Sequence, residues 1–248
     1  MARPIFARAI FFDAVGTLFQ VRGSVGQVYW ELARSHGVSS TPEEIEAAFQ
    51  DVFSQSPPLT FSRLQSGLLR QSEKAWWKKV VEEVFTRVGM IRDFDGYFDE
   101  VFRVFSGIRG WVLYPETREV LGKLKASGFM IGVISNFDSR LLTVCSDLQI
   151  FQYLDSIHVS SRSGSAKPDA SIFNKALSQH GLRPREAVHV GDSLEEDVAG
   201  ARAAGLTPVW INRTPDRTSG PDVKAGAAVE APLSIRNLNQ ILPLIQPI

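Results

Sequence analysis

Cysteine is nearly absent from this chain of 248 residues, which contains Cys145 alone. A single thiol excludes an intramolecular disulfide and any cysteine-rich zinc site. No histidine or lysine cluster stands beside Cys145 to lower the pKa of its thiol. We therefore expect Cys145 to be a small buried apolar residue rather than a reactive group.

Net charge and long apolar runs are also missing. The chain has 27 Lys and Arg against 27 Asp and Glu, a formal net charge of zero, whereas nucleic-acid-binding proteins usually carry a basic excess. No stretch reaches the roughly 18 apolar residues of a membrane span, and the apolar run near the N-terminus is too short for a signal peptide. We expect a soluble cytoplasmic protein with neither a nucleic-acid nor a membrane partner.

The composition is that of a globular protein, with 44% hydrophobic and 22% charged residues. At roughly 150 residues per domain, the length fits one large domain or two unequal ones. An apolar run at 8–12, ended by Asp13 and Gly16, predicts a buried strand and a turn. The segment that follows has a helical pattern, and we expect helices at 25–36, 42–53, 72–88 and 98–105, with Thr41 before Pro42 as a helix start.

The second half alternates strands with helices. We expect strands at 130–135, 157–159, 187–190 and 208–211, helices at 116–125, 169–180, 195–204 and 233–244, and loops at 160–165 and 214–226. Such alternation predicts a parallel sheet, and the strand at 8–12 must join it, because one strand cannot stand alone. The predicted fold is therefore α/β: a doubly wound, Rossmann-like core from 1–20 and 109–248, with a helical domain at 21–108 inserted after the first strand.

Polar residues follow three of the predicted strands: Asp13 after Phe12, Ser135-Asn136 after Ile134, and Gly191-Asp192-Ser193 after Val190. The carboxyl ends of parallel strands meet in one crevice, where ligands bind. Free backbone N–H groups of small turns and the positive end of a helix make such a crevice suitable for phosphate.

Three carboxylates are expected there, from Asp13, Asp192 and Asp197, and they would repel one another without a cation. A hard ion that prefers oxygen ligands, such as Mg²⁺, fits this set. Lys167 could place a further positive charge against a phosphate or an attacking carboxylate. A nucleophile, a cation and anion-binding donors are what phosphoryl transfer through an aspartyl-phosphate requires.

The residues quoted above, in their order along the chain, resemble the four motifs of the haloacid dehalogenase-like (HAD) hydrolase superfamily. The motifs are Phe11-Phe12-Asp13-Ala14-Val15-Gly16-Thr17-Leu18, Ile134-Ser135-Asn136, Lys167-Pro168, and Val190-Gly191-Asp192-Ser193 with Asp197. The resemblance covers nearly the whole chain, and the helical insertion is similar to the C1-type cap of that superfamily. Ser135-Asn136-Phe137-Asp138 and Trp76-Trp77 also resemble one narrower subfamily.

The resemblance implies a role for each motif residue. Asp13 would be the nucleophile and a Mg²⁺ ligand, Val15 would lend its backbone carbonyl to the metal, and Thr17 would orient the nucleophile or the phosphate. Ser135 and the backbone of Asn136 would hold a phosphate oxygen, and Lys167 would neutralise charge. Asp192 would bind the metal directly, and Asp197 would be a second ligand or hold a metal-bound water.

Val15 departs from the phosphatase pattern. Phosphatases of the superfamily usually have an aspartate there as general acid and base, a function worth about 10²–10⁴-fold in rate. Alkyl phosphates should therefore react slowly unless a cap residue supplies the proton, whereas aryl or acyl phosphates do not need it. The first motif is also similar to that of 2-haloacid dehalogenases, in which the aspartate attacks carbon and halide leaves unprotonated.

Those dehalogenases need no metal and lack the Gly-Asp of the fourth motif. We therefore favour a Mg²⁺-dependent phosphatase for a small phosphorylated metabolite, acting as a monomer or homodimer. The alternatives are a 2-haloacid dehalogenase and a catalytically weak binding protein. Other polar and aromatic residues receive structural interpretations: His189 as packed core, Glu195 and Glu196 as first-turn helix carboxylates, and Phe49, Phe53, Trp76, Trp77, Phe85 and Phe105 as the cap's own core.

Overall fold

The strands of the main sheet all run parallel to their neighbours. The structure is a computed structural model that describes residues 4–61, 65–213 and 232–248. Its six-stranded sheet has the order β6-β5-β2-β7-β8-β9. The strands are β2 (Ala9–Phe12), β5 (Met130–Ser135), β6 (Ser156–Val159), β7 (Ala187–Gly191), β8 (Thr207–Ile211) and β9 (Leu233–Ile235).

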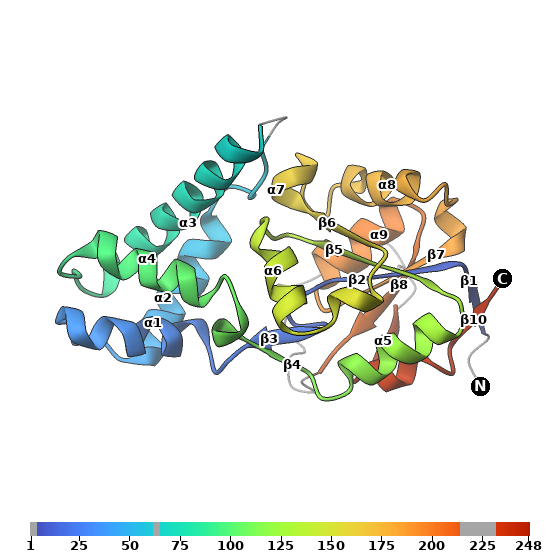
Figure 1. Cartoon of the computed structure of the whole chain (residues 1–248), viewed down its shortest axis with the longest axis horizontal. Helices are drawn as coiled ribbons and strands as arrows, with labels where there is room; N and C mark the ends of the chain where they lie inside the picture. Colours follow the sequence, from blue (N-terminus) through green and yellow to red (C-terminus); the bar gives the residue numbers. More distant parts are fainter. Residues whose placement is uncertain (1–3, 62–64, 214–231) are drawn as a thin grey trace, which may run out of the picture.

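Alternate residues of the central strand face opposite layers, as the period of two in a strand requires. Ile10 and Phe12 pack in the cluster that includes residues of α5 (Thr117–Ala126) and α6 (Arg140–Asp147). Phe11 packs in the second cluster, with residues of α8 (Ala170–Gln179) and α9 (Gly200–Ala203). Helices thus cover both faces of the sheet (Figure 1), which confirms the predicted doubly wound α/β core.

Four α-helices make up most of the described part of the inserted segment, and they lie together at one end of the molecule, away from the C-terminus (Figure 1). They are α1 (Val25–Ala33), α2 (Pro42–Gln55), α3 (Ser66–Val88) and α4 (Phe94–Val104). Thr41 begins α2 with a capping box to Glu44, as the sequence predicts. An antiparallel pair, β3 (Phe19–Val21) and β4 (Trp111–Leu113), carries the chain between the helices and the sheet.

Several expected elements differ from those observed. The helix expected at 233–244 is wrong: Leu233–Ile235 is strand β9, Leu238–Ile241 is a short 3-10 helix, and Ile245–Pro247 is strand β10, which pairs with β1 (Ile5–Ala7). The loop expected at 160–165 begins with a helical turn, α7 (Ser160–Ser163), and the helix expected at 195–204 starts as a π-helix at Leu194–Ala199. The loop expected at 214–226 lies outside the described residues.

Cys145 is fully buried on α6, and burial raises the pKa of its thiol to about 12, so an unreactive apolar role is confirmed. Within the described ranges, no helix is both long enough and apolar enough to cross a membrane.

Candidate active site

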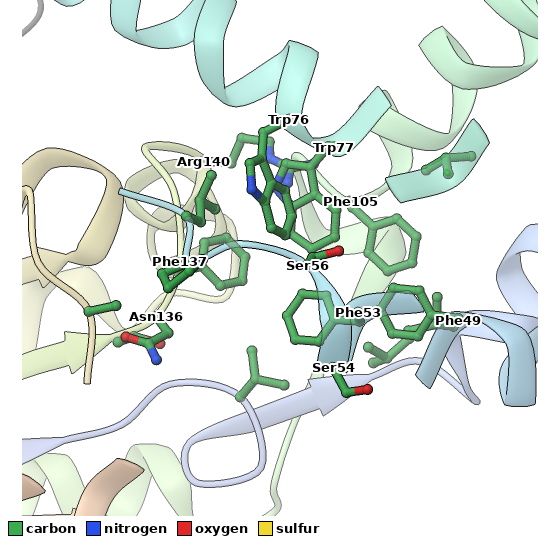
Figure 2. A pocket seen from close by; sticks show the side chains of 18 of the residues that line it. Phe49, Phe53, Ser54, Ser56, Trp76, Trp77, Phe105, Asn136, Phe137 and Arg140 are labelled. Carbon is green, nitrogen blue, oxygen red and sulfur yellow. The ribbon is translucent and has the colours of Figure 1, made fainter. Parts of the chain in front are cut away.

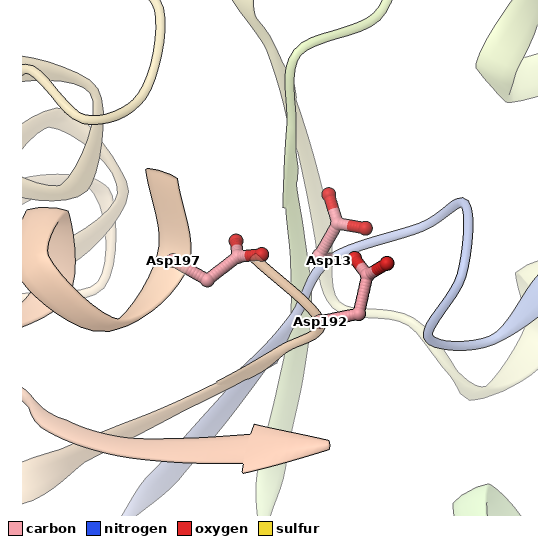
Figure 3. Close-up of side chains that lie close together, drawn as sticks. All are labelled: Asp13, Asp192 and Asp197. Atoms are coloured by element: carbon pink, nitrogen blue, oxygen red, sulfur yellow. The ribbon is translucent and has the colours of Figure 1, made fainter. Parts of the chain in front are cut away.

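The central strand of the sheet places Asp13 between the ends of its two neighbours. Phe12 is paired with Val133 of β5 on one side and with Val190 of β7 on the other. The residues that follow these strands therefore meet at one edge, as the sequence predicts. Carboxylate oxygens of Asp13, Asp192 and Asp197 lie within 4.8 Å of one another, and Figure 3 shows the three groups gathered at the strand ends.

Lys167 binds two of these carboxylates at once. Its ammonium Nζ donates to Asp13 Oδ1 at 2.6 Å and to Asp197 Oδ1 at 2.5 Å. The hydroxyl of Ser135 donates to the same Asp13 oxygen at 3.1 Å. Asp13 is 6% exposed and Lys167 is 3% exposed, so the ion pair is buried and only weakly screened by solvent.

Asn136 sets the position of the lysine rather than pointing freely into the crevice. Its amide nitrogen donates to the carbonyl of Lys167 at 2.9 Å, and its oxygen accepts the Lys167 backbone N–H at 2.8 Å. These two bonds fix the loop that carries the ammonium to Asp13. The backbone of Asn136, which the sequence assigns to phosphate binding, remains a candidate for that role.

Both oxygens of Asp197 are already occupied by hydrogen bonds. Besides Lys167, Oδ1 accepts from His189 Nε2 at 2.8 Å, and Oδ2 accepts from the Ser193 backbone N–H at 3.0 Å. His189 is fully buried on β7, so it is part of the core, as expected, but it also holds a site carboxylate. That second role follows from the inward direction of its side chain, which the apolar neighbours in the sequence do not reveal.

Two glycines let the carboxylates approach the strand ends. Gly16 adopts a φ of +85°, and a Cβ there would lie 2.3 Å from Asp192 Oδ2. A Cβ on Gly191 would lie 2.1 Å from the carboxyl carbon of Asp197. Any larger residue at either position would displace a carboxylate, because real Cβ contacts are never this short.

The turn after Asp13 is held by a residue that the sequence analysis did not single out. Arg213, which follows β8, donates to the carbonyls of Gly16 at 3.2 Å and Thr17 at 2.7 Å, and pairs with Glu116 at 2.8 Å. Thr17 itself is buried, and its hydroxyl makes no hydrogen bond to the described residues. The Thr17 side chain therefore remains available to a ligand group or to a rearranged Asp13.

Burial and charge shift the pKa values of the cluster in opposite directions. Burial raises the pKa of Asp13, and the neighbouring Lys167 opposes that rise only in part. Burial also acts to raise the pKa of Asp197, but Lys167 and His189 outweigh it and hold this carboxyl ionised. The pKa of Lys167 is raised above its usual value, because Asp13 and Asp197 overcome the effect of burial.

Asp192 is enclosed by the crevice walls, yet its surface is open to solvent through the cavity. Desolvation by these walls, and then the charges of Asp13 and Asp197, raise its pKa. Like charges this close disfavour the ionised form of Asp192.

The three carboxylates are a chemically suitable donor set for a divalent cation. Oxygens bound to one Mg²⁺ at about 2.1 Å lie at most about 4.2 Å apart, close to the spacing observed. Asp13 and Asp192 are suited to direct coordination. Asp197, with both oxygens engaged, is better placed to act through a metal-bound water, one of the two roles that the resemblance implies.

A cavity of about 540 Å³ extends from these carboxylates into the helical cap. Val15, at the position of the missing acid, presents its side chain to this space, as does Glu196. Figure 2 shows the rings of Phe53, Trp76 and Trp77 pointing into the same cavity. Of the aromatic residues assigned to the cap's own core, Phe85 and Phe105 are buried in it, Phe49, Trp76 and Trp77 pack against it, and Phe53 stacks on Phe49. All of them except Phe85 also line the cavity.

Glu196 lies in the first turn of the helix that follows Ser193, as expected. It is half-buried and lines the cavity, and burial raises its pKa. Glu195, by contrast, is exposed and does not line the cavity, as expected.

A family model for haloacid dehalogenase-like hydrolases matches residues 7–205. The chain belongs to this hydrolase family. The haloacid dehalogenase-like hydrolase domain-containing protein 3 of Xenopus laevis is 34% identical over 215 residues, covering 85% of this chain and 86% of the relative. It represents the narrower subfamily that the segments 135–138 and 76–77 resemble.

Solved structures of HAD hydrolases share the whole architecture. A dehalogenase in an intermediate complex has a TM-score of 0.73 at 21% identity and covers 99% of both chains. A HAD phosphatase from Thermococcus onnurineus has a TM-score of 0.62 at 22% identity and covers 94% of this chain and 95% of its own. At these identities the likeness shows the HAD fold alone, and the chemistry must be argued from the site.

Proposed function

We propose that this HAD hydrolase is a Mg²⁺-dependent phosphatase that acts on a small phosphorylated metabolite through an aspartyl-phosphate on Asp13. One observation carries the proposal: Lys167 bridges Asp13 and Asp197, while Asp192 completes an oxygen cluster that suits a divalent cation. A nucleophile that attacks a dianionic phosphate needs positive charge beside it, which Lys167 and a divalent cation would supply together.

In the first step, a carboxylate oxygen of Asp13 attacks phosphorus and the bond to the leaving oxygen breaks. The ammonium of Lys167, already 2.6 Å from Asp13, offsets charge on the transferring phosphoryl group and orients the nucleophile. Ser135 and the backbone of Asn136 would hold a phosphate oxygen, a role supported by the hydrogen bond from the Ser135 hydroxyl to Asp13.

In the second step, water attacks phosphorus and releases phosphate, which returns Asp13 to its carboxylate form. Thr17 would bind the phosphate or the nucleophile with its unpartnered hydroxyl. Val15 can neither donate nor accept a proton, so both steps proceed without the usual acid and base at that position.

A bound Mg²⁺ would supply charge neutralisation for the incoming phosphate. We propose Asp13, Asp192 and the backbone carbonyl of Val15 as its direct ligands, with Asp197 as a further ligand or as the holder of a metal-bound water. Asp197 also fixes Lys167, so its loss would affect both the metal site and the ammonium.

The test is hydrolysis of a panel of phosphate esters and 2-haloacids, with Mg²⁺ and with EDTA. We expect phosphate release that requires Mg²⁺ and is abolished by Asp13→Asn. Asp99→Asn is the matched control, because the same chemical change is made at an exposed cap residue that pairs with Lys74. Turnover that survives Asp13→Asn would contradict the nucleophile assignment.

Val15 and the apolar cavity favour a second candidate, a 2-haloacid dehalogenase, because halide leaves without a proton. In that case, halide release would persist in EDTA and no phosphate ester would react. A third outcome, binding of BeF₃⁻ without turnover of any substrate, would indicate a HAD-like binding protein.

A further inference from the structure

The cap end of the cavity is apolar and aromatic, whereas its charged residues lie mainly at the sheet end. The ring of Phe53 is 43% exposed toward solvent and stacks on Trp77 with centroids 5.9 Å apart and an interplanar angle of 17°. Trp76 meets the Phe53 ring edge-on at 6.1 Å. Flat aromatic surfaces of this kind bind another ring by stacking or edge contact.

Several polar side chains at the cap end already bond within the protein. The hydroxyls of Ser54 and Ser56 donate to backbone carbonyls at 2.8 Å. The indole N–H of Trp76 donates to the Pro57 carbonyl at 3.1 Å, and that of Trp77 donates to Asp138 at 2.6 Å. A sugar or another hydroxyl-rich group would therefore lose its hydrogen bonds to water there and find few in return.

The positive charge of Arg140, which lines the cap end, is also neutralised by a partner within the protein. Its guanidinium pairs with the fully buried Asp138 at 2.7 Å and lies 4.1 Å over the ring of Phe102. The charge of Arg140 is therefore already balanced and its guanidinium already stacked on a ring. The part of the substrate near the cap should accordingly be uncharged and apolar.

The sheet end of the cavity restricts the chemistry of the leaving group, and this restriction does not depend on the cap. Val15 occupies the position where the resemblance places a proton donor, so no group at that position protonates the leaving oxygen as it departs. A phenol ionises near pKa 10, whereas an alcohol resembles water, whose pKa is about 15.7. A phenoxide leaves without a proton far more readily than an alkoxide does.

We propose that the substrates are aryl phosphate monoesters, with the ring against Phe53, Trp76 and Trp77 and the phosphate at Asp13. The inference rests on the proposed phosphatase function. Asp13 bonds to phosphorus, the bond from phosphorus to the aryl oxygen breaks, and its electron pair leaves on the phenoxide. Water then cleaves the aspartyl-phosphate, and the proton it loses is taken up through solvent by the phenoxide.

The test compares phenyl phosphate, benzyl phosphate and acetyl phosphate with the Mg²⁺-loaded full chain. Phenyl and benzyl phosphate carry the same ring, but only the first has an aryl oxygen as its leaving group. We expect benzyl phosphate to inhibit competitively with a Ki close to the KM of phenyl phosphate, while its own kcat is at least about 100-fold lower. Equal kcat values, or a Ki no better than that of butyl phosphate, would overturn the inference.

Phe53→Ala tests the ring site without touching the carboxylates. It should raise the KM of phenyl phosphate and the Ki of benzyl phosphate together, by about three- to tenfold, and leave the KM of acetyl phosphate unchanged. Phe151→Ala is the matched control, since Phe151 is 48% exposed and lies outside the cavity. An unchanged Ki in Phe53→Ala would overturn the ring assignment.

Acetyl phosphate distinguishes a failure of the aryl-ester inference from a failure of the proposed phosphatase function, because it has a good leaving group and no ring. Its hydrolysis without any preference for aryl over alkyl esters would overturn the substrate class and leave the phosphatase standing. Failure of all three phosphate compounds to react would overturn both the substrate class and the phosphatase function.

Discussion

Replacement of Lys167 by methionine removes the buried ammonium and keeps most of the aliphatic chain. The ammonium donates to Asp13 at 2.6 Å and to Asp197 at 2.5 Å, and the lysine side chain is 1% exposed. A hydrogen bond to a charged group contributes about 1.5–3 kcal/mol, and removal of one partner from a buried ion pair costs about 3–5 kcal/mol. We therefore expect the free energy of unfolding at pH 8, without Mg²⁺, to fall by about 4 kcal/mol.

The loss of unfolding free energy in Lys167→Met should depend on pH. The folded-state pKa of Lys167 is raised, so its stabilisation is fully present below its unfolded pKa of about 10.4, and therefore across pH 5–8. In the variant, Asp13 loses the ammonium that lowers its pKa, so its carboxyl takes up a proton more readily on acidification. Protonation relieves the unpaired charge, and each unit of pKa rise above the working pH offsets about 1.4 kcal/mol. The destabilisation should thus be smaller at pH 5 than at pH 8.

The assay is urea unfolding followed by tryptophan fluorescence at both pH values. Lys74→Met is the control, because Lys74 forms an exposed ion pair with Asp99 and should lose no more than about 1 kcal/mol. If Lys167→Met lost as little as this control, or lost the same amount at pH 5 and pH 8, the buried pairing described above would be refuted.

Three further predictions concern the proton, the turn and the cap. Val15→Asp should raise kcat on benzyl phosphate by up to about 100-fold and change phenyl phosphate much less; no gain would mean that another group supplies the proton. Arg213→Gln breaks the hydrogen bonds to the Gly16 and Thr17 carbonyls and should lower kcat/KM about tenfold with an unchanged far-UV spectrum, whereas unchanged kcat/KM would refute its positioning role. Glu73, on α3, accepts three hydrogen bonds from Ser139 and Ser161 of the core; Glu73→Leu should cost about 1–3 kcal/mol in urea unfolding, and Glu73→Gln should cost less because it keeps the acceptor.

The parts of the fold that the sequence predicts are those determined by local pattern. The strand expected at 130–135 is observed with those bounds as β5, because a short apolar run between Gly128 and a polar end has few alternatives. The convergence of Asp13, Ser135 and Asp192 follows from strand order alone. Each strand and its polar end are thus visible in the local sequence, and the rule that parallel strands end at one edge brings the polar ends together.

The errors arise where distant contacts decide the local structure. Leu233, Ile235, Leu238 and Ile241 have helix-like spacing, yet Leu233 and Ile235 pair with Val209 and Ile211 and extend the sheet edge. The helical turn at 160–163 is supported by Ser160, which donates to the carbonyls of Leu59 and Phe137. Its neighbour Ser161 donates to Glu73. Leu59 and Glu73 belong to the cap and lie 101 and 88 positions away from the serines that they bind, so no local pattern contains these contacts.

The site shows the same division. The sequence was sufficient to place the motif residues in the crevice. The hydrogen bond of His189 to Asp197 and that of Arg213 to the Gly16 carbonyl depend on the direction of side chains across the sheet, which the sequence does not reveal. The cap aromatics were expected to pack on one another. They do so in part, for Phe49 stacks on Phe53 at 5.4 Å, while the same rings also line a cavity that opens onto Asp13.

The most direct test of the central claim is the mass of the peptide that contains Asp13, taken from enzyme quenched in acid during turnover of phenyl phosphate with Mg²⁺. We predict that tryptic peptide 9–22 gains one phosphoryl group, that fragmentation places it on Asp13, and that the gain is absent from Asp13→Asn. A phosphoryl group on any other residue, or steady turnover with an unmodified peptide, would contradict the account.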